Sequence, residues 1–95
     1  MKAGEYQVVG LRFAKAKDGS EGAIIYYVTA FESYEENSAL SFAGHKVGQE
    51  YTKDPDLVKK IHDLKINDVC KFGYRKGYAG SAMLDDVNVI KPSTK

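Results

Sequence analysis

The stretch KFGYRKGYAGSAML, residues 71–84, contains three basic, three aromatic and three glycine residues and no acidic residue. Lysine and arginine neutralise phosphates, and aromatic rings stack on nucleobases without demanding a particular sequence. Glycine allows a backbone to bend and to approach a ligand closely. This combination is typical of a flexible hairpin that holds a single-stranded nucleic acid.

A second basic cluster lies near the N-terminus, although the chain as a whole is almost neutral. Fourteen Lys and Arg face thirteen Asp and Glu, for a net charge of +1. That balance argues against a histone-like polycation, but a locally basic surface can still attract a polyanion. The two clusters are Arg12, Lys15 and Lys17, and Lys71, Arg75 and Lys76.

No pattern in the sequence predicts an enzyme. His45 and His62 have no second His or Cys at ligand spacing, so we expect no metal site. Cys70 is the single cysteine and lies between apolar residues, so we expect a buried thiol. Asp85 and Asp86 would point to opposite faces of a strand unless a bulge turns them. We therefore expect neither catalysis nor a cofactor.

The length of 95 residues and the hydrophobic fraction of 43% predict one domain over residues 1–95, with flexible ends at 1–4 and 92–95. The core of such a domain is modest, which favours a homodimer. The first residues lack the apolar core of a signal peptide, and no apolar run approaches membrane-spanning length. We expect a cytoplasmic protein that does not contact a membrane.

The pattern of apolar residues predicts mainly strands. Residues 6–16 form the first, with Val9, Leu11 and Phe13 on one face, and Asp18-Gly19 predicts a type I′ hairpin turn. Residues 22–34 form a second strand that is apolar on both faces. A polar turn over 35–38 precedes a weaker strand over 39–52, interrupted by glycines.

A short helix and a final hairpin follow. Asp54 is a good N-cap before Pro55, and the apolar spacing predicts a helix that ends near residues 65–67 and buries Leu57, Val58, Ile61 and Leu64. Residues 69–75 and 78–90 predict two strands, with a bulge near Asp85 and Asp86.

This order predicts a mainly β protein, namely a five-stranded OB-like Greek-key barrel with one short helix between strands 3 and 4. An SH3-like barrel is the nearest competitor but lacks a helix there. In the OB-fold the loops between strands 1 and 2 and between strands 4 and 5 flank the binding face, which would bring both basic clusters to one rim. The residues predicted to contact nucleic acid are Arg12, Lys15, Lys17, Tyr27, Phe31, Lys71, Tyr74, Arg75, Lys76 and Tyr78.

The second strand leaves one choice open, because Tyr26 and Tyr27 are adjacent and only one can face outward. We predict that Tyr27 faces outward with Thr29 and Phe31. The alternate set is mostly aliphatic and suits the core: Ile24, Tyr26, Val28 and Ala30. Structural roles compete with binding throughout. Tyr74 and Tyr78 can pair across the hairpin, Tyr27 and Phe31 can cover a dimer interface, and the basic residues can be ordinary solvated charges.

The segment GSAMLDDVNVI, followed by Lys91 and Pro92, resembles the last strand of the filamentous-phage gene V type of single-stranded DNA-binding protein. In both, a Gly-Ser, a Met and an Asp lead into an alternating apolar strand and a short basic tail. The resemblance covers residue 80 to the C-terminus. The helix that begins near Asp54 and the pair Asp85 and Asp86 depart from it, so no individual DNA contact is carried over.

The resemblance implies a dimeric OB-type barrel that coats single-stranded DNA during phage or plasmid replication or recombination. Together with the basic and aromatic rim, it predicts a non-sequence-specific single-stranded DNA-binding protein. Two alternatives stay open. The first is a protein-interaction barrel, a small accessory subunit that uses the same aromatic face, which the near-neutral charge favours. The second is an RNA-binding barrel, which the sequence does not distinguish from a DNA-binding one.

Overall fold

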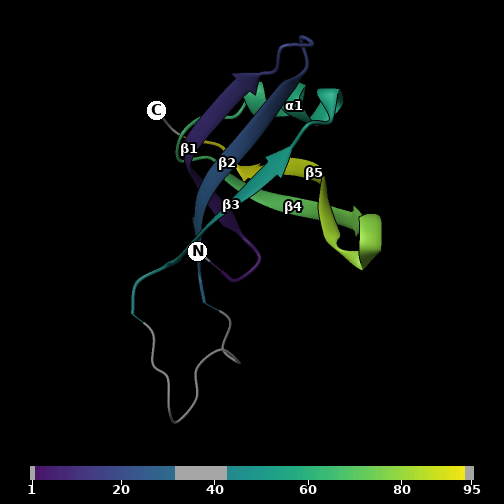
Figure 1. The fold of residues 1–95 in the computed structure, drawn as a ribbon. Helices are drawn as coiled ribbons and strands as arrows, with labels where there is room; N and C mark the ends of the chain where they lie inside the picture. Colours follow the sequence, from purple (N-terminus) through teal and green to yellow (C-terminus); the bar gives the residue numbers. More distant parts are fainter. Residues whose placement is uncertain (1, 32–42, 94–95) are drawn as a thin grey trace.

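The computed structural model describes residues 2–31 and 43–93, which form one antiparallel sheet and a short helix (Figure 1). The elements are β1 (Tyr6–Lys15), β2 (Glu21–Thr29), β3 (Lys46–Thr52), α1 (Pro55–His62), β4 (Val69–Lys76), the 3₁₀ turn η2 (Tyr78–Gly80) and β5 (Ala82–Lys91). The five strands lie in the order β3-β2-β1-β4-β5. The mainly β prediction, with a helix between strands 3 and 4, is confirmed. The sheet is not closed between β3 and β5, so closure into a barrel is not seen.

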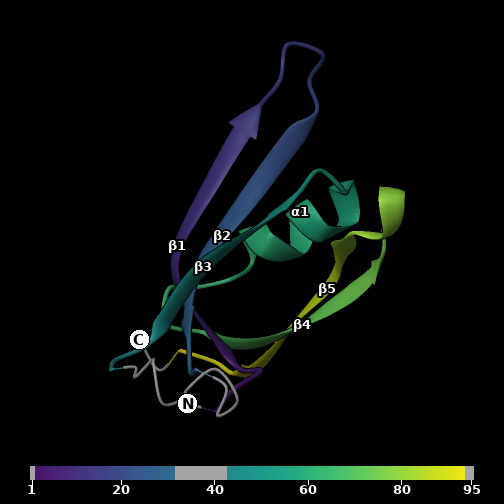
Figure 2. The same ribbon diagram turned by 60° about the horizontal axis from the view of Figure 1, so that its bottom comes forward.

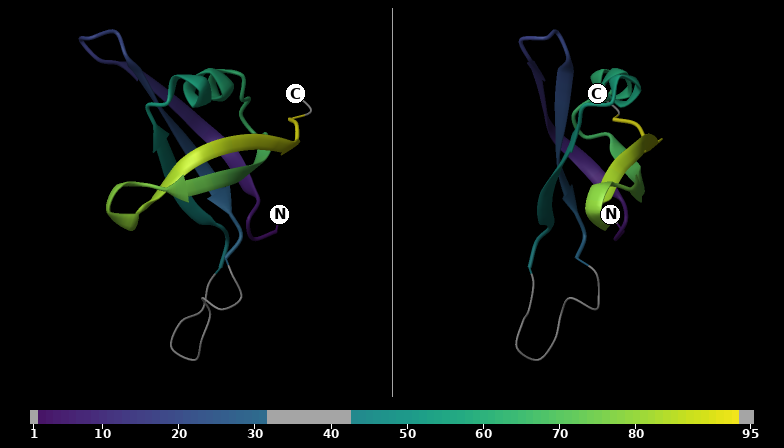
Figure 3. Two further views of the ribbon diagram at one scale, coloured as in Figure 1. Left: turned by 90° about the vertical axis from the view of Figure 1, so that its right-hand side faces the viewer. Right: turned by 45° about the vertical axis from the view of Figure 1, so that its right-hand side comes forward.

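The sheet is bent into two layers that cross each other (Figure 3). One layer contains β1, β2 and β3, and the β4–β5 hairpin crosses over it together with α1. Strand β1 belongs to both layers, because it pairs with β2 along its length and with β4 only through Tyr6 and Gln7. We call the face of the β1–β2–β3 layer that is turned toward the β4–β5 hairpin its inner face, and the opposite face its outer face.

A β-bulge lies at the point where β1 changes partners. Val8 is opposite Tyr27 and Gly10 is opposite Tyr26, so Val9 is the extra residue. Val8 is fully buried, whereas 45% of Val9 is exposed. The expected face of Val9, Leu11 and Phe13 is therefore wrong for Val9, because the bulge changes the alternation of the strand and puts Val8 inside with the other two.

The β1–β2 hairpin forms as expected, but with a different turn. The N–H of Gly19 donates to the Ala16 carbonyl at 3.0 Å, and the N–H of Ala16 donates to the Ser20 carbonyl at 2.8 Å. Gly19 has a φ of 89°, whereas Asp18 does not have a positive φ. A type I′ turn needs both, so that prediction is wrong. The loop fits the three-residue hairpin in which a glycine follows a type I turn.

The strands on either side of residues 32–42 are shorter than predicted. Strand β2 ends at Thr29, so Phe31 lies beyond it, and β3 begins at Lys46 and runs through Gly48 without interruption. The predicted polar turn at 35–38 lies outside the described residues, as do the parts of the two predicted strands over 32–34 and 39–42.

The helix begins as the sequence predicts. The Asp54 carboxylate accepts a hydrogen bond from the N–H of Asp56 at 2.9 Å, and Pro55 occupies the first turn. The helix ends earlier than expected, at His62. Its apolar face packs on β2 and β5 and lies between the two layers (Figure 2). The residues buried on this side are Leu57, Val58, Ile61 and Leu64, as predicted.

The C-terminal end of α1 is held against the β1–β2 hairpin. The His62 ring stacks on Phe13 with centroids 3.9 Å apart, and its Nε2 lies 2.8 Å from Oε1 of Glu21.

No helix in residues 2–31 and 43–93 combines the length and the apolar character that crossing a membrane would require.

Residues from both layers and the helix meet in one core. The fully buried members are Val8, Ala23, Ile25, Ile61 and Cys70. Cys70 is buried as predicted, and this burial, with a smaller effect of nearby Asp68, raises the pKa of its thiol to about 11. The thiol is therefore protonated and chemically quiet at neutral pH.

The β4–β5 hairpin contains the predicted bulge. Gly73 is opposite Asp86 and Tyr74 is opposite Leu84, which leaves Asp85 as the extra residue. The end of the hairpin differs from the prediction, because residues 78–80 form a 3₁₀ turn and β5 starts only at Ala82.

The end of β5 is tied to the loop before β4 by a buried carboxylate. Asp68 accepts hydrogen bonds from the N–H of Lys65 at 2.9 Å and from the N–H of Ser93 at 2.6 Å. The Asp68 carbonyl also accepts the N–H of Val8 at 2.9 Å. One residue thus joins the loop, the chain near its C-terminal end and the bulged strand β1.

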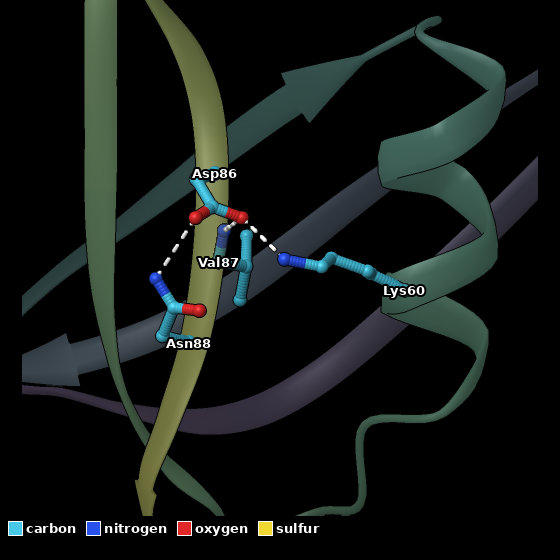
Figure 4. A network of polar contacts seen from close by, with 4 residues as sticks. All are labelled: Lys60, Asp86, Val87 and Asn88. Carbon is cyan, nitrogen blue, oxygen red and sulfur yellow. Dashed lines mark hydrogen bonds and ion pairs between the residues drawn. The ribbon is translucent and has the colours of Figure 1, made fainter.

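Asp86 joins β5 to the helix (Figure 4). Its carboxylate accepts from Nζ of Lys60 at 2.5 Å, from Nδ2 of Asn88 at 3.0 Å and from the N–H of Val87 at 2.9 Å. These bonds, that from Lys60 first, lower the pKa of Asp86 below its ordinary value of 3.8.

This network predicts a pH-dependent contribution to stability. A carboxyl group whose pKa is lower in the folded state stabilises the fold above its unfolded pKa, and loses this effect as the pH falls through the folded pKa. Asp86→Asn should therefore lower the melting temperature most at about pH 6, with the difference from the wild type shrinking below about pH 4. Thermal unfolding monitored by circular dichroism across this range measures the difference. A difference that stays constant from neutral to strongly acidic pH would refute the linkage.

Candidate nucleic-acid interface

The outer surface of the β1–β2–β3 layer contains an open hollow of about 430 Å³ beside the β1–β2 hairpin. Its charged lining residues are Arg12, Lys15 and Lys53, all of them cations. The remaining wall is formed mainly by apolar and small residues, among them Gly22 and Ile24 of β2. We call this the first hollow. Three positive charges around an uncharged floor suit a ligand that carries phosphates on an otherwise uncharged body.

Tyr51 forms one side of the first hollow. It is opposite Ile24 in the β2–β3 ladder and is 52% exposed. The end of its ring lies above Gly22, where an added Cβ would be 2.9 Å from Oη and 3.0 Å from Cε1 of Tyr51. The glycine therefore makes room for the ring on the sheet. A tyrosine that is supported by the sheet and open to solvent can stack on a nucleobase.

Tyr26 is a second aromatic residue on this outer face. Its ring lies over Gly10, where an added Cβ would be 3.4 Å from Cδ2 of Tyr26. The side chains of Ile24, Tyr26 and Val28 are half-buried, whereas Ala23, Ile25 and Thr29 are buried. The outward set of β2 is therefore the one that contains Tyr26.

The predicted orientation of Tyr27 is wrong, because Tyr27 shares the inner face with Ala23 and Ile25. Tyr27 contacts Tyr6 edge-on with centroids 4.8 Å apart and Phe72 edge-on at 5.5 Å. Tyr6 and Phe72 themselves stack at 4.4 Å. Large rings fill the space where the two layers meet. Burial, with a smaller effect of Glu50, raises the pKa of Tyr27.

Tyr74 also has a structural role. Its hydroxyl donates a hydrogen bond to Oε1 of Glu50 at 2.8 Å, which joins β4 to β3. Burial and this bond to Glu50 raise the pKa of Tyr74. Tyr74 is opposite Leu84, so the alternative pairing with Tyr78 is not part of the register. Tyr78 lies in η2.

A second hollow of about 510 Å³ lies between the start of α1 and the β4–β5 hairpin. Arg75 and Met83 line it on the hairpin side, and Pro55 lines it on the helix side. Tyr51 and Lys53 line both hollows. Two residues thus line both the hollow that contains Arg12 and Lys15 and the hollow that contains Arg75.

The other predicted contacts lie outside the two hollows. Lys17 is exposed in the β1–β2 loop, Lys71 and Lys76 are exposed on β4, and Phe31 is half-buried beyond the end of β2. Of the predicted set, Arg12 and Lys15 line the first hollow and Arg75 lines the second.

The predicted contacts do not include Tyr51 and Lys53, the two residues that line both hollows. A signal was available, because residues two apart in an extended segment point to the same side. Lys53 also directly precedes the helix N-cap, Asp54, and Tyr51 lies three residues before it. An aromatic residue and a cation on the same side of a strand end, close to a helix N-cap, indicate a position at the edge of the candidate binding surface.

Comparison of the chain with protein-family models, with curated proteins and with solved structures finds no match.

The packing of Tyr27 predicts that Gly48 is needed for stability. An added Cβ at Gly48 would lie 2.6 Å from Oη and 2.7 Å from Cζ of Tyr27, whose ring is held by Tyr6 and Phe72. Gly48→Ala should therefore lower the free energy of unfolding by about 1–3 kcal/mol. Urea unfolding followed by circular dichroism measures this change.

Gly22→Ala is the matched control. The clash there is with the exposed end of Tyr51, which can swing into solvent. We expect a change in the free energy of unfolding within about 0.5 kcal/mol. Equal destabilisation by the two variants would mean that Tyr27 is no more constrained than Tyr51, contrary to the packing described above.

Proposed function

We propose that the protein binds single-stranded DNA, without strong sequence preference, through the first and second hollows and the ring of Tyr51. One observation carries the proposal: a hollow whose charged lining is entirely cationic adjoins the exposed ring of Tyr51, and Tyr51 and Lys53 also line a second hollow, whose charged residues are Lys53, Asp54 and Arg75. Cations along a groove follow the phosphate backbone, and the ring stacks on a base.

The shape of the surface favours a single strand over a duplex. Tyr51 is supported by Gly22 and Ile24 on the sheet side and is open on the other. A ring in this position can stack only on a base whose face is accessible, and duplex bases are already stacked on one another. The first hollow is lined by the β1–β2 hairpin and the end of β3, and the second by the end of β3, the start of α1 and the β4–β5 hairpin.

The topology also supports the proposal. The order β3-β2-β1-β4-β5, with a helix between the third and fourth strands, agrees with an OB-fold, which is a partly open barrel. In that fold strands 2 and 3 and the loops 1–2 and 4–5 bind oligonucleotides, and both hollows lie among these elements. The resemblance of residues 80–92 to the gene V type suggests a cytoplasmic role in phage or plasmid replication or recombination, performed by a dimer.

A protein-interaction function is the competing proposal. It is favoured by β3, a strand at the edge of the sheet whose Val47 is 73% exposed beside Val28 of β2. Exposed apolar residues on an edge strand are typical of surfaces that another chain covers. This proposal predicts no salt-dependent binding of oligonucleotides.

Fluorescence anisotropy of a labelled poly-thymidine oligonucleotide tests the proposal, with a duplex and a poly-uridine strand of equal length alongside. We expect binding of the DNA strand that weakens as salt is raised, and weaker binding of the duplex. Equal or tighter binding of poly-uridine would assign the site to RNA. An absence of binding to every oligonucleotide at low salt would exclude a nucleic-acid function and leave the protein-interaction proposal.

Two kinds of variant should affect this binding differently. Tyr51→Ala removes a stacking ring and should weaken binding by roughly 1–3 kcal/mol with little change in the salt dependence. Arg12→Ala removes a phosphate contact and should reduce the slope of log K against log salt by about 0.7.

Lys59→Ala is the matched control, because Lys59 is exposed on α1 and lines neither hollow. It changes the net charge as Arg12→Ala does. If it reduced the slope equally, binding would depend on overall charge and not on the first hollow.

A further inference from the structure

We propose that Asp85 forms an ion pair with Arg75 in the free protein and competes with a DNA phosphate for this arginine. The strand then binds in the second hollow only when a phosphate replaces the Asp85 carboxylate. This inference rests on the proposed function and assigns a regulatory residue to the same site. It starts from the β-bulge in β5, where Asp85 is the residue without an opposite partner in the ladder.

The bulge places the Asp85 carboxylate beside the one cation that the hairpin contributes to the second hollow. Oδ1 of Asp85 lies 3.6 Å from Nη1 of Arg75. The side chains are 50% and 53% exposed, respectively. Arg75 therefore already has an anionic partner at the place where a phosphate would bind.

The ion pair is of a kind that exchanges readily. It is longer than a charge-assisted hydrogen bond, and the structure gives it a single close approach and not the two parallel bonds of a strong arginine–carboxylate pair. Exposed pairs of this kind contribute little to stability. A phosphate has the same charge sign and similar acceptor oxygens, so it can replace the carboxylate.

Two other carboxylates are held differently, namely that of Asp54, which lines the second hollow, and that of Asp86, the neighbour of Asp85 in β5. Asp54 accepts the N–H of Asp56 at 2.9 Å and caps the helix. Asp86 accepts three hydrogen bonds, including that from Lys60 at 2.5 Å. Both are fixed by the fold, whereas Asp85 is held only through its contact with Arg75 among the interactions described for it. Asp85 is thus the carboxylate whose partner a ligand can take.

Exchange has a measurable consequence for the salt dependence. When a phosphate replaces Asp85 on Arg75, the released carboxylate stays beside the strand and offsets most of the positive charge that Arg75 brings to the phosphate. Arg75 therefore adds little to the slope in the wild type. In Asp85→Asn the full contribution of one phosphate contact should appear, and the slope should steepen by about 0.7. Binding at low salt should tighten about two- to fivefold, as expected on removal of a weak competing ion pair.

The experiment measures the anisotropy of the labelled poly-thymidine strand with the wild-type protein, Asp85→Asn and Asp86→Asn across a salt series. Asp86→Asn is the matched control, because it adds the same charge one residue away but frees Lys60, which lines neither hollow. We expect tighter binding and a steeper slope for Asp85→Asn than for Asp86→Asn. Equal effects of the two variants would overturn the proposal.

Together with the wild type and Asp85→Asn, the variants Arg75→Ala and Arg75→Ala/Asp85→Asn complete a double-mutant cycle. This cycle measures the coupling between the two side chains in binding. The gain in affinity that Asp85→Asn produces should disappear when Arg75 is absent. A gain that persists would mean that Asp85 acts by general repulsion of the negatively charged strand. If the wild type binds strands and the cycle shows no coupling, only this inference fails. If the wild type binds no strand, the proposed function fails and this inference fails with it.

Discussion

The bulge at Val9 is the constraint on which the arrangement of the sheet depends. On one side of it β1 pairs only with β2, and on the other it pairs with β2 and β4 together. Val8 is fixed there from three directions. Its N–H donates to Asp68, its carbonyl accepts the N–H of Asn67 at 2.8 Å, and its side chain is fully buried opposite Tyr27. A bulge bends a strand and increases its twist, which allows one sheet to form two crossed layers.

This bend decides which tyrosines are structural and which are open to a ligand. Where the layers meet, the space between them is wide enough for Tyr6, Tyr27 and Phe72, and these rings contact one another. The outer face keeps Tyr26 and Tyr51, each with its ring over a glycine of the neighbouring strand. Two neighbouring tyrosines in β2 thus have different surroundings because they lie on opposite sides of a curved sheet.

Local signals predicted much of the fold, because the interactions behind them are local. The hairpin at Asp18-Gly19, the N-cap at Asp54 and the bulge at Asp85 depend on residues within a few positions of each other. The orientation of β2 does not depend on such nearby residues. Its two faces are both largely apolar, so alternation alone cannot say which is inside, and the answer depends on β1 and β4. The same holds for the site: the shared position of Tyr51 and Lys53 follows from how β3 and α1 lie against the two hairpins, which no short window of sequence contains.

A protein with a net charge of +1 can still present a strongly positive surface if its acidic residues are engaged elsewhere. Asp68 is buried in backbone hydrogen bonds, Asp86 is held by Lys60 beside the helix, and Glu21 faces His62 at the end of α1. The partners of these carboxylates do not line the first hollow. The charged residues that do line it are Arg12, Lys15 and Lys53, and a charge acts over a Debye length of roughly 8 Å at physiological salt. If the protein binds a polyanion, as proposed, the distribution of partners among the acidic residues would decide the place of binding more than the sum of charges does.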